Sequence, residues 1–103
     1  MKAETEAQLR NEAARGMRAN ELMSDELLVE AFTTLENRLT QEWANSPVRD
    51  SEGRERIWVM QKLLKNVEDH LREIATTGKM AALQLDQERT ILQKMKEFVQ
   101  EFP

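Results

Sequence analysis

The chain contains no cysteine and no tyrosine, and its single histidine is His70. Without cysteine it cannot form disulfide bonds, thiolate nucleophiles or zinc sites with sulfur ligands. One histidine leaves no way to assemble a nucleophile, a base and an orienting group, and no glutamate lies three residues before His70 to make a Glu-x-x-His metal motif. We therefore expect a protein that is not an enzyme, with no catalytic residue, no metal site and no cofactor.

A long apolar segment is also missing. No uncharged apolar run approaches the roughly 20 residues of a membrane-spanning helix, and the polar, acidic residues 1–6 do not resemble a signal peptide. The net charge is −4 and no basic stripe is visible, so we do not expect the monomer to bind nucleic acid through its phosphates. These absences indicate a soluble, cytoplasmic protein without membrane contacts.

The composition that remains is typical of helices. Aromatic residues make up only 5% of the chain and charged residues 33%, and residues with high helix propensity dominate. We predict an all-α fold in a single domain of residues 1–103, either a helical hairpin or a small elongated bundle. The predicted elements are helices at about residues 4–22, 25–44 and 54–100, with a loop at 45–53.

The strongest pattern is a row of apolar or small residues that starts at Ile57 and recurs at alternating steps of three and four. We call this row the seam, and its only charged member is Glu88. Heptad spacing of this kind indicates a helix that packs one narrow face against another helix, as in a coiled coil. An unbroken helix of this span would be about 70 Å long, more than the width of a compact domain of this size, and therefore implies assembly. The seam comprises Ile57, Met60, Leu64, Val67, Leu71, Ile74, Gly78, Ala81, Leu85, Glu88, Leu92, Met95, Val99 and Phe102.

Gly78 leaves two alternatives open for this helix. It could be a C-cap that ends one helix before another begins. It could also lie inside one long helix, where a small residue next to Ala81 lets a partner backbone approach closely. Because the heptad register is the same on both sides of Gly78, the pattern favours a continuous or merely kinked helix over a broken one.

The loop around Pro47 predicts a hairpin. Proline disfavours the helical conformation of the preceding residue, Ser46, and so ends the second helix. The short loop then favours an antiparallel return. We expect the apolar face of the second helix to lie against the first half of the seam, from Ile57 to Ile74. That face consists of Leu28, Phe32, Leu35, Leu39 and Trp43.

The second helix is too short to cover the other half of the seam as well. The first helix, another copy of the chain or a different protein must therefore cover it, and this unmatched apolar stripe is the best functional clue in the sequence. Trp58 lies beside the seam and is a further candidate for an outside contact, since tryptophan is enriched at interfaces. The candidate oligomer or partner interface consists of Trp58, Leu85, Leu92, Met95, Val99 and Phe102.

Residues 14–32 and 46–58 carry a resemblance. The run from Ala14 to Phe32 and the run Ser-Pro-Val-Arg-Asp-Ser-Glu-Gly-Arg-Glu-Arg-Ile-Trp at 46–58 resemble small, mostly uncharacterised helical proteins of tailed bacteriophages and prophages. Such proteins are often encoded near packaging and virion genes, and the likeness covers about residues 14–83. It includes no catalytic motif and so carries over no site residue. It implies a phage setting, in the host cytoplasm or associated with the virion.

Three functions follow as hypotheses. The first is a non-enzymatic, phage-like assembly protein, whether structural, scaffolding or a packaging accessory, that self-associates through the C-terminal half of the seam. The second is a small acidic inhibitor or adaptor that binds a host protein, of the anti-defence or nucleic-acid-mimic type, and would present Glu30, Glu36 and Glu42 to a basic partner. The third is a DNA-binding packaging or regulatory subunit. No short helix-turn-helix with a basic recognition helix supports the third hypothesis.

Overall fold

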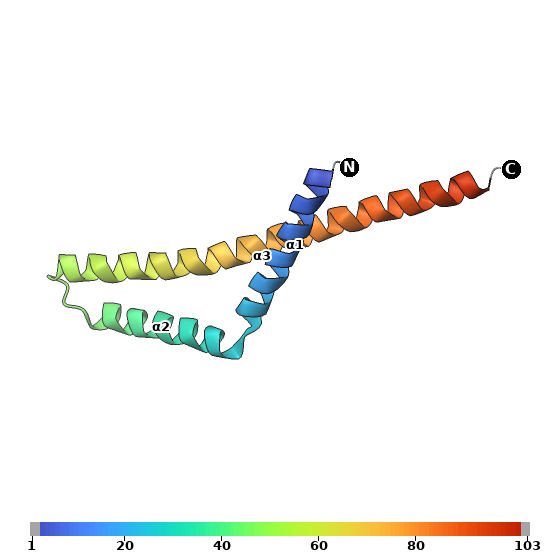
Figure 1. Cartoon of the computed structure of the whole chain (residues 1–103). Helices are drawn as coiled ribbons and strands as arrows, with labels where there is room; N and C mark the ends of the chain where they lie inside the picture. The colour runs from blue at the N-terminus through green and yellow to red at the C-terminus, as the bar shows by residue number, and fades with distance from the viewer. Residues whose placement is uncertain (1–2, 102–103) are drawn as a thin grey trace. The chain divides into compact units, whose positions relative to one another are not determined.

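The computed structural model describes residues 3–101. Within that range the chain forms three α-helices and no strand (Figure 1). The helices are α1 (Ala3–Ser24), α2 (Glu26–Asn45) and α3 (Ser51–Gln100). This confirms the all-α prediction. The chain divides into two compact units: the hairpin unit is Asn20–Glu73, and the crossing unit consists of the residues before Asn20 and those after Glu73.

Local hydrogen bonds explain where α2 and α3 begin. The Asp25 side chain accepts a hydrogen bond of 2.9 Å from the backbone N–H of Leu28, which makes Asp25 the N-cap of α2. The Asp50 side chain accepts one of 3.0 Å from the backbone N–H of Gly53 in the same way. Pro47 follows the extended C-cap residue Ser46, so the chain leaves α2 where the sequence predicts.

The helix α3 runs through Gly78 without interruption. Gly78 has no positive φ and therefore does not act as a C-cap there. Gly78 could either cap one helix or lie inside a longer one, and the structure shows the second alternative, a continuous helix. Gly78 and Ala81 are the two buried residues of α3.

In the hairpin unit, α2 runs beside the first part of α3 and covers one edge of the seam (Figure 1). Leu28, Phe32, Leu39 and Trp43 are half-buried, as are Ile57, Leu64 and Leu71 on α3, whereas Leu35 is exposed. The seam residues Met60 and Val67 remain 52% and 51% exposed. The helix α2 therefore covers only alternate members of the first half of the seam, and none of its own residues is fully buried.

Two cation–π contacts lie near the closed end of the hairpin. The Arg54 guanidinium lies 4.2 Å from the centre of the Trp43 ring, and the Lys62 ammonium lies 5.5 Å from that of Trp58. Trp43 is thus part of the contact between the two helices, while Trp58 is exposed. Contacts of this kind at partly exposed sites contribute about 0.5–1 kcal/mol each.

The core of the crossing unit is small and lies where α1 crosses α3. Among the described residues, its buried apolar side chains are Leu9, Ala19 and Ala81, and both Gly16 and Gly78 are buried beside them. Small residues at this point let the two helix backbones come close together. The crossing therefore depends on backbone proximity more than on large side chains.

Candidate self-association surface

The crossing determines how much of the seam α1 covers. A Cβ atom placed on Gly16 would lie 3.1 Å from the carbonyl oxygen of Ile74 and 2.6 Å from Cα of Gly78. Further along α3, Ala81 is buried, and Leu85 and Glu88 are half-buried. The first helix thus covers the beginning of the C-terminal half of the seam, and residues 89–101 are all exposed.

Past Glu88, every residue of α3 is exposed. The apolar ones follow heptad spacing, with Leu92, Met95 and Val99 on the seam and Ile91 and Phe98 beside it. We call these five residues the C-terminal stripe. Their exposed fractions are 57% for Ile91, 59% for Leu92, 59% for Met95, 62% for Phe98 and 68% for Val99. Phe102, which the sequence adds to the candidate interface, lies outside the described residues.

A groove opens beside the stripe, between α1 and α3. We call it the V-groove, and its volume is about 710 Å³. Leu85, Ile91 and Leu92 supply apolar surface, and charged side chains from both helices surround it, with Arg10 and Glu6 of α1 forming an ion pair. Since Ile91 and Leu92 belong to both features, the V-groove and the C-terminal stripe form one continuous surface. The charged lining residues are Glu6, Arg10, Glu88, Arg89 and Lys96.

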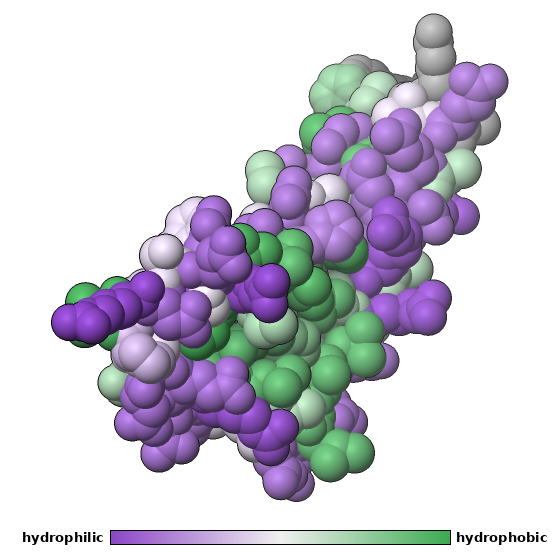
Figure 2. Space-filling model, turned by 90° about the vertical axis from the view of Figure 1, so that its left-hand side faces the viewer, coloured by the Kyte–Doolittle hydropathy of each residue, from purple (hydrophilic) through white to green (hydrophobic). Residues whose placement is uncertain are grey.

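The hairpin unit has apolar surface of its own. Trp58, Met60, Leu63 and Val67 of α3 are all about half exposed. The space-filling view shows a continuous apolar area bordered by hydrophilic surface (Figure 2). Trp58 does not share a face of α3 with Met60, because the two residues lie about 160° apart around the helix. Trp58, which the sequence selects as an outside contact, is therefore accessible, but it belongs to a different unit from the C-terminal stripe.

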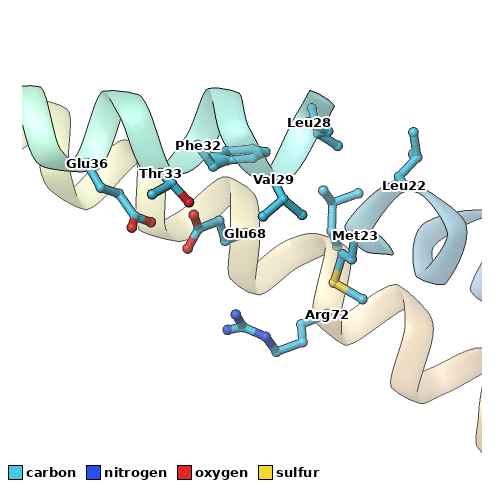
Figure 3. A pocket seen from close by; sticks show the side chains of 10 residues that line it. Leu22, Met23, Leu28, Val29, Phe32, Thr33, Glu36, Glu68 and Arg72 are labelled. Atoms are coloured by element: carbon cyan, nitrogen blue, oxygen red, sulfur yellow. The ribbon is translucent and has the colours of Figure 1, made fainter. Parts of the chain in front are cut away.

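A smaller cavity of about 280 Å³ lies between α2 and α3 within the hairpin unit (Figure 3). Phe32 and Val29 provide apolar walls, and the carboxyl groups of Glu36 and Glu68 turn toward one another at one end (Figure 3). A hydrogen bond from the protonated Glu68 carboxyl to Glu36 raises the pKa of Glu68, and partial burial and the Glu36 charge add to the effect. The Arg72 charge lowers the pKa of Glu68, but it offsets this rise only in part.

The acidic residues of the second hypothesis do not share one face of α2. Glu30, Glu36 and Glu42 are all exposed, but they follow one another at intervals of six residues. At 3.6 residues per turn, neighbours in this series point about 120° apart. The structure therefore lends no support to a single acidic surface on this helix.

His70 and the acidic side chains are the remaining candidates for a metal site. His70 is exposed, and no group of three or more histidine, aspartate or glutamate side chains among residues 3–101 could hold a metal ion. No helix within these residues has the length and apolar character needed to cross a membrane.

Comparison with protein-family models, curated proteins and solved structures found no match. The surface described above therefore rests on the residues of this chain. The V-groove is the feature that the sequence pattern misses, because it depends on the angle at which α1 crosses α3. Its one signal in the sequence is the pair of small residues, Gly16 and Ala19, at the same spacing of three as Gly78 and Ala81.

Proposed function

We propose that this protein is a non-enzymatic assembly protein that self-associates through the C-terminal stripe. The observation that carries the proposal is the exposure of Leu92, Met95 and Val99 at heptad spacing, beyond the point where α1 leaves the seam. The phage-like setting, whether structural, scaffolding or packaging, rests on the sequence resemblance alone. The oligomer itself is argued from the residues.

Burial of the stripe supplies a driving force for association. Full burial of a leucine, valine, methionine or phenylalanine side chain stabilises by about 1.5–3 kcal/mol. More than half of each stripe side chain remains exposed in the single chain, so association can still gain a large part of that free energy at each position. An apolar row of this regularity on a solvent-facing helix marks an interaction surface.

The stripe covers fewer than three helical turns, which is short for a coiled coil. Coiled coils are recognised by three to four heptads or more, whereas Ile91 to Val99 contains little more than one. A stable assembly must therefore bury additional surface. The V-groove, which is continuous with the stripe and has the half-buried Leu85 in its lining, supplies that surface.

The test is the solution mass of a charged double variant. Leu92→Glu together with Val99→Glu places two carboxylates in the stripe and should convert the oligomer to a monomer, while the helix content stays the same. Light scattering coupled to size exclusion measures the mass, and circular dichroism measures the helix content. The matched control is Leu27→Glu with Val48→Glu, because both residues are exposed and apolar but lie in the hairpin unit away from its seam.

Two other results would contradict the proposal. If Met60→Glu with Val67→Glu dissociates the oligomer and the stripe variant does not, the hairpin unit carries the interface. If the parent protein is monomeric at all concentrations and salt levels, the self-association proposal is wrong. The second hypothesis, a small protein that binds a different protein, would then be the better one.

A further inference from the structure

We propose that two copies of this chain associate in an antiparallel pair, in which the last turns of α3 of each copy enter the V-groove of the other. This inference rests on the proposed self-association and adds its direction and its register. The occupant of the V-groove is thus a second copy of the same helix. The argument uses the position of α1, the charge at Glu88 and the lining of the groove.

The position of α1 disfavours a parallel pair. In a parallel, in-register coiled coil each residue of the seam faces the same residue of the second copy. At Gly78 and Ala81 the seam is already occupied by α1, whose Gly16 approaches within contact distance of Gly78. A parallel partner would therefore meet α1 of both copies at the same level and would have to separate from α3 there.

An antiparallel partner avoids this obstruction. If Leu92 of one copy lies opposite Met95 of the other, Glu88 lies opposite Val99. The helix α3 ends at Gln100, so its last residue would reach the level of Gln87 on the second copy. The paired segments then coincide with the exposed part of α3, and α1 stays in place on Ala81.

The charge pattern favours the same direction. Glu88 is the only charged residue of the seam, and a parallel pair would bring two Glu88 carboxylates face to face. Like charges directly opposite one another destabilise a coiled coil. In the antiparallel register, Val99 of the second copy lies opposite Glu88, and Lys96 of that copy lies about one helical turn from Val99. The Lys96 ammonium therefore attracts the Glu88 carboxylate. The two-fold symmetry of the pair gives this attraction twice.

The lining of the V-groove complements the end of α3. The last turn of α3 contains no basic residue, and Glu97 is acidic. The carbonyl groups at a helix C-terminus also carry partial negative charge. The charged lining of the groove has three cations, Arg10, Arg89 and Lys96, and two carboxylates, Glu6 and Glu88. Arg10 is paired with Glu6, but the lining still carries a net positive charge, which is suited to that end of the helix. The partner helix thus meets apolar surface at Leu85 within a lining of net positive charge.

Cysteine cross-linking distinguishes the two directions, because the chain has no cysteine of its own. The Glu88→Cys and Val99→Cys variants are prepared separately, and one of them carries a size tag. Each variant is then oxidised alone and in a mixture with the other. In the antiparallel register the mixture should form the tagged–untagged disulfide dimer, while each variant alone should form little. The two positions are eleven residues apart, about 16 Å along the helix, so residues 99 of two antiparallel copies cannot meet.

Each outcome has a separate meaning. If Val99→Cys cross-links efficiently to itself, the pair is parallel, and the antiparallel inference fails although self-association survives. If the parent is oligomeric but no combination cross-links, the V-groove is not the interface. If the parent is a monomer, both this inference and the proposed function fail. A Leu27→Cys and Val48→Cys mixture measures random collision.

A charge-swap series gives a second test that needs no cross-link. Glu88→Lys and Lys96→Glu should each weaken the dimer roughly two- to tenfold in dissociation constant, as expected for partly exposed ion pairs. The double variant should recover most of the loss, because each copy then offers the reversed pair to the other. In a parallel dimer these positions lie about 12 Å apart along the helix, and the double variant would recover nothing.

Discussion

A Cβ atom on Gly78 would lie 2.5 Å from Cα of Gly16 and 2.7 Å from the carbonyl oxygen of Glu12, closer than real Cβ contacts allow. The two glycines therefore let the backbones of α1 and α3 touch at the crossing. This close approach also places Cα–H groups next to carbonyl oxygens, a weak favourable contact that recurs between closely packed helices. The crossing in turn sets where the C-terminal stripe begins.

The first prediction concerns this crossing. Gly78→Leu should lower the free energy of unfolding by about 1–3 kcal/mol, because the added side chain forces the helices apart. The change also replaces the poor helix former glycine, a gain of about 1 kcal/mol that the loss of packing must exceed. Ala82→Leu is the matched control, since Ala82 is exposed on the same helix. Thermal unfolding followed by circular dichroism compares them, and equal midpoints would show that the crossing contributes no stability.

The second prediction concerns the start of α2. Asp25→Ala removes the side-chain acceptor for the Leu28 N–H and should cost about 1 kcal/mol of stability. Ser24→Ala is the control, because the Ser24 hydroxyl donates to the Asn20 carbonyl oxygen and caps no helix start. Urea denaturation of both variants measures the difference. A loss at Ser24 as large as that at Asp25 would contradict the assignment of the cap.

The third prediction concerns pH and Glu68. Its pKa in the folded chain is raised above the ordinary value of 4.5 by Glu36 and partial burial. A group whose pKa is raised by folding binds its proton more tightly in the folded state. Its contribution to stability is therefore fully present below about pH 4.5 and is lost as the pH rises through the raised pKa.

Glu68→Gln tests this directly. The variant should be more stable than the parent near pH 7, where the two carboxylates repel, and the advantage should shrink toward pH 4. The experiment compares denaturation midpoints of the two proteins across that range, with Glu73→Gln, an exposed residue on the same helix, as the control. A difference between parent and variant that does not change with pH would rule out the carboxyl pair as its source.

The fourth prediction concerns backbone protection along α3. Self-association through the C-terminal stripe should slow hydrogen exchange of the amides of residues 91–100 as the protein concentration rises. Amides near Gly16 and Gly78 should be protected equally at all concentrations, because the crossing lies within one chain. Mass-spectrometric exchange at two concentrations measures both regions. Protection of residues 91–100 that is independent of concentration would exclude this surface as the site of association.

Much of the fold could be predicted from single residues and their spacing. Asp25 and Pro47 mark helix boundaries through local chemistry, capping for one and a restricted backbone for the other. The constant heptad register on both sides of Gly78 predicts that α3 continues, because a loop would have no physical reason to preserve the phase. These inferences succeed because each depends on interactions within a few residues along the chain.

The candidate surface could be predicted only in part. The sequence identifies Leu92, Met95 and Val99 as apolar positions in need of a partner, but it does not say whether α1 covers them. That depends on the angle and the level at which α1 crosses α3, which follow from the contact between Gly16 and Gly78, residues far apart in the chain. The incomplete cover of Met60 and Val67 by α2 has a similar cause, because the rotation of each helix about its axis decides which edge of the seam is buried.

The sequence by itself therefore determined the three helices, the helix boundaries at Asp25 and Pro47 and the heptad row, since these depend on local propensity, capping and periodicity. The start of α3 differs, because the helix begins at Ser51, directly after the Asp50 side chain that accepts from Gly53, and not near residue 54. Only the tertiary structure decided that α1 stops covering the seam near Glu88, that the V-groove opens beside Leu92 and that Glu36 meets Glu68. Those features depend on how separate helices meet in space. No local pattern along the chain specifies that arrangement.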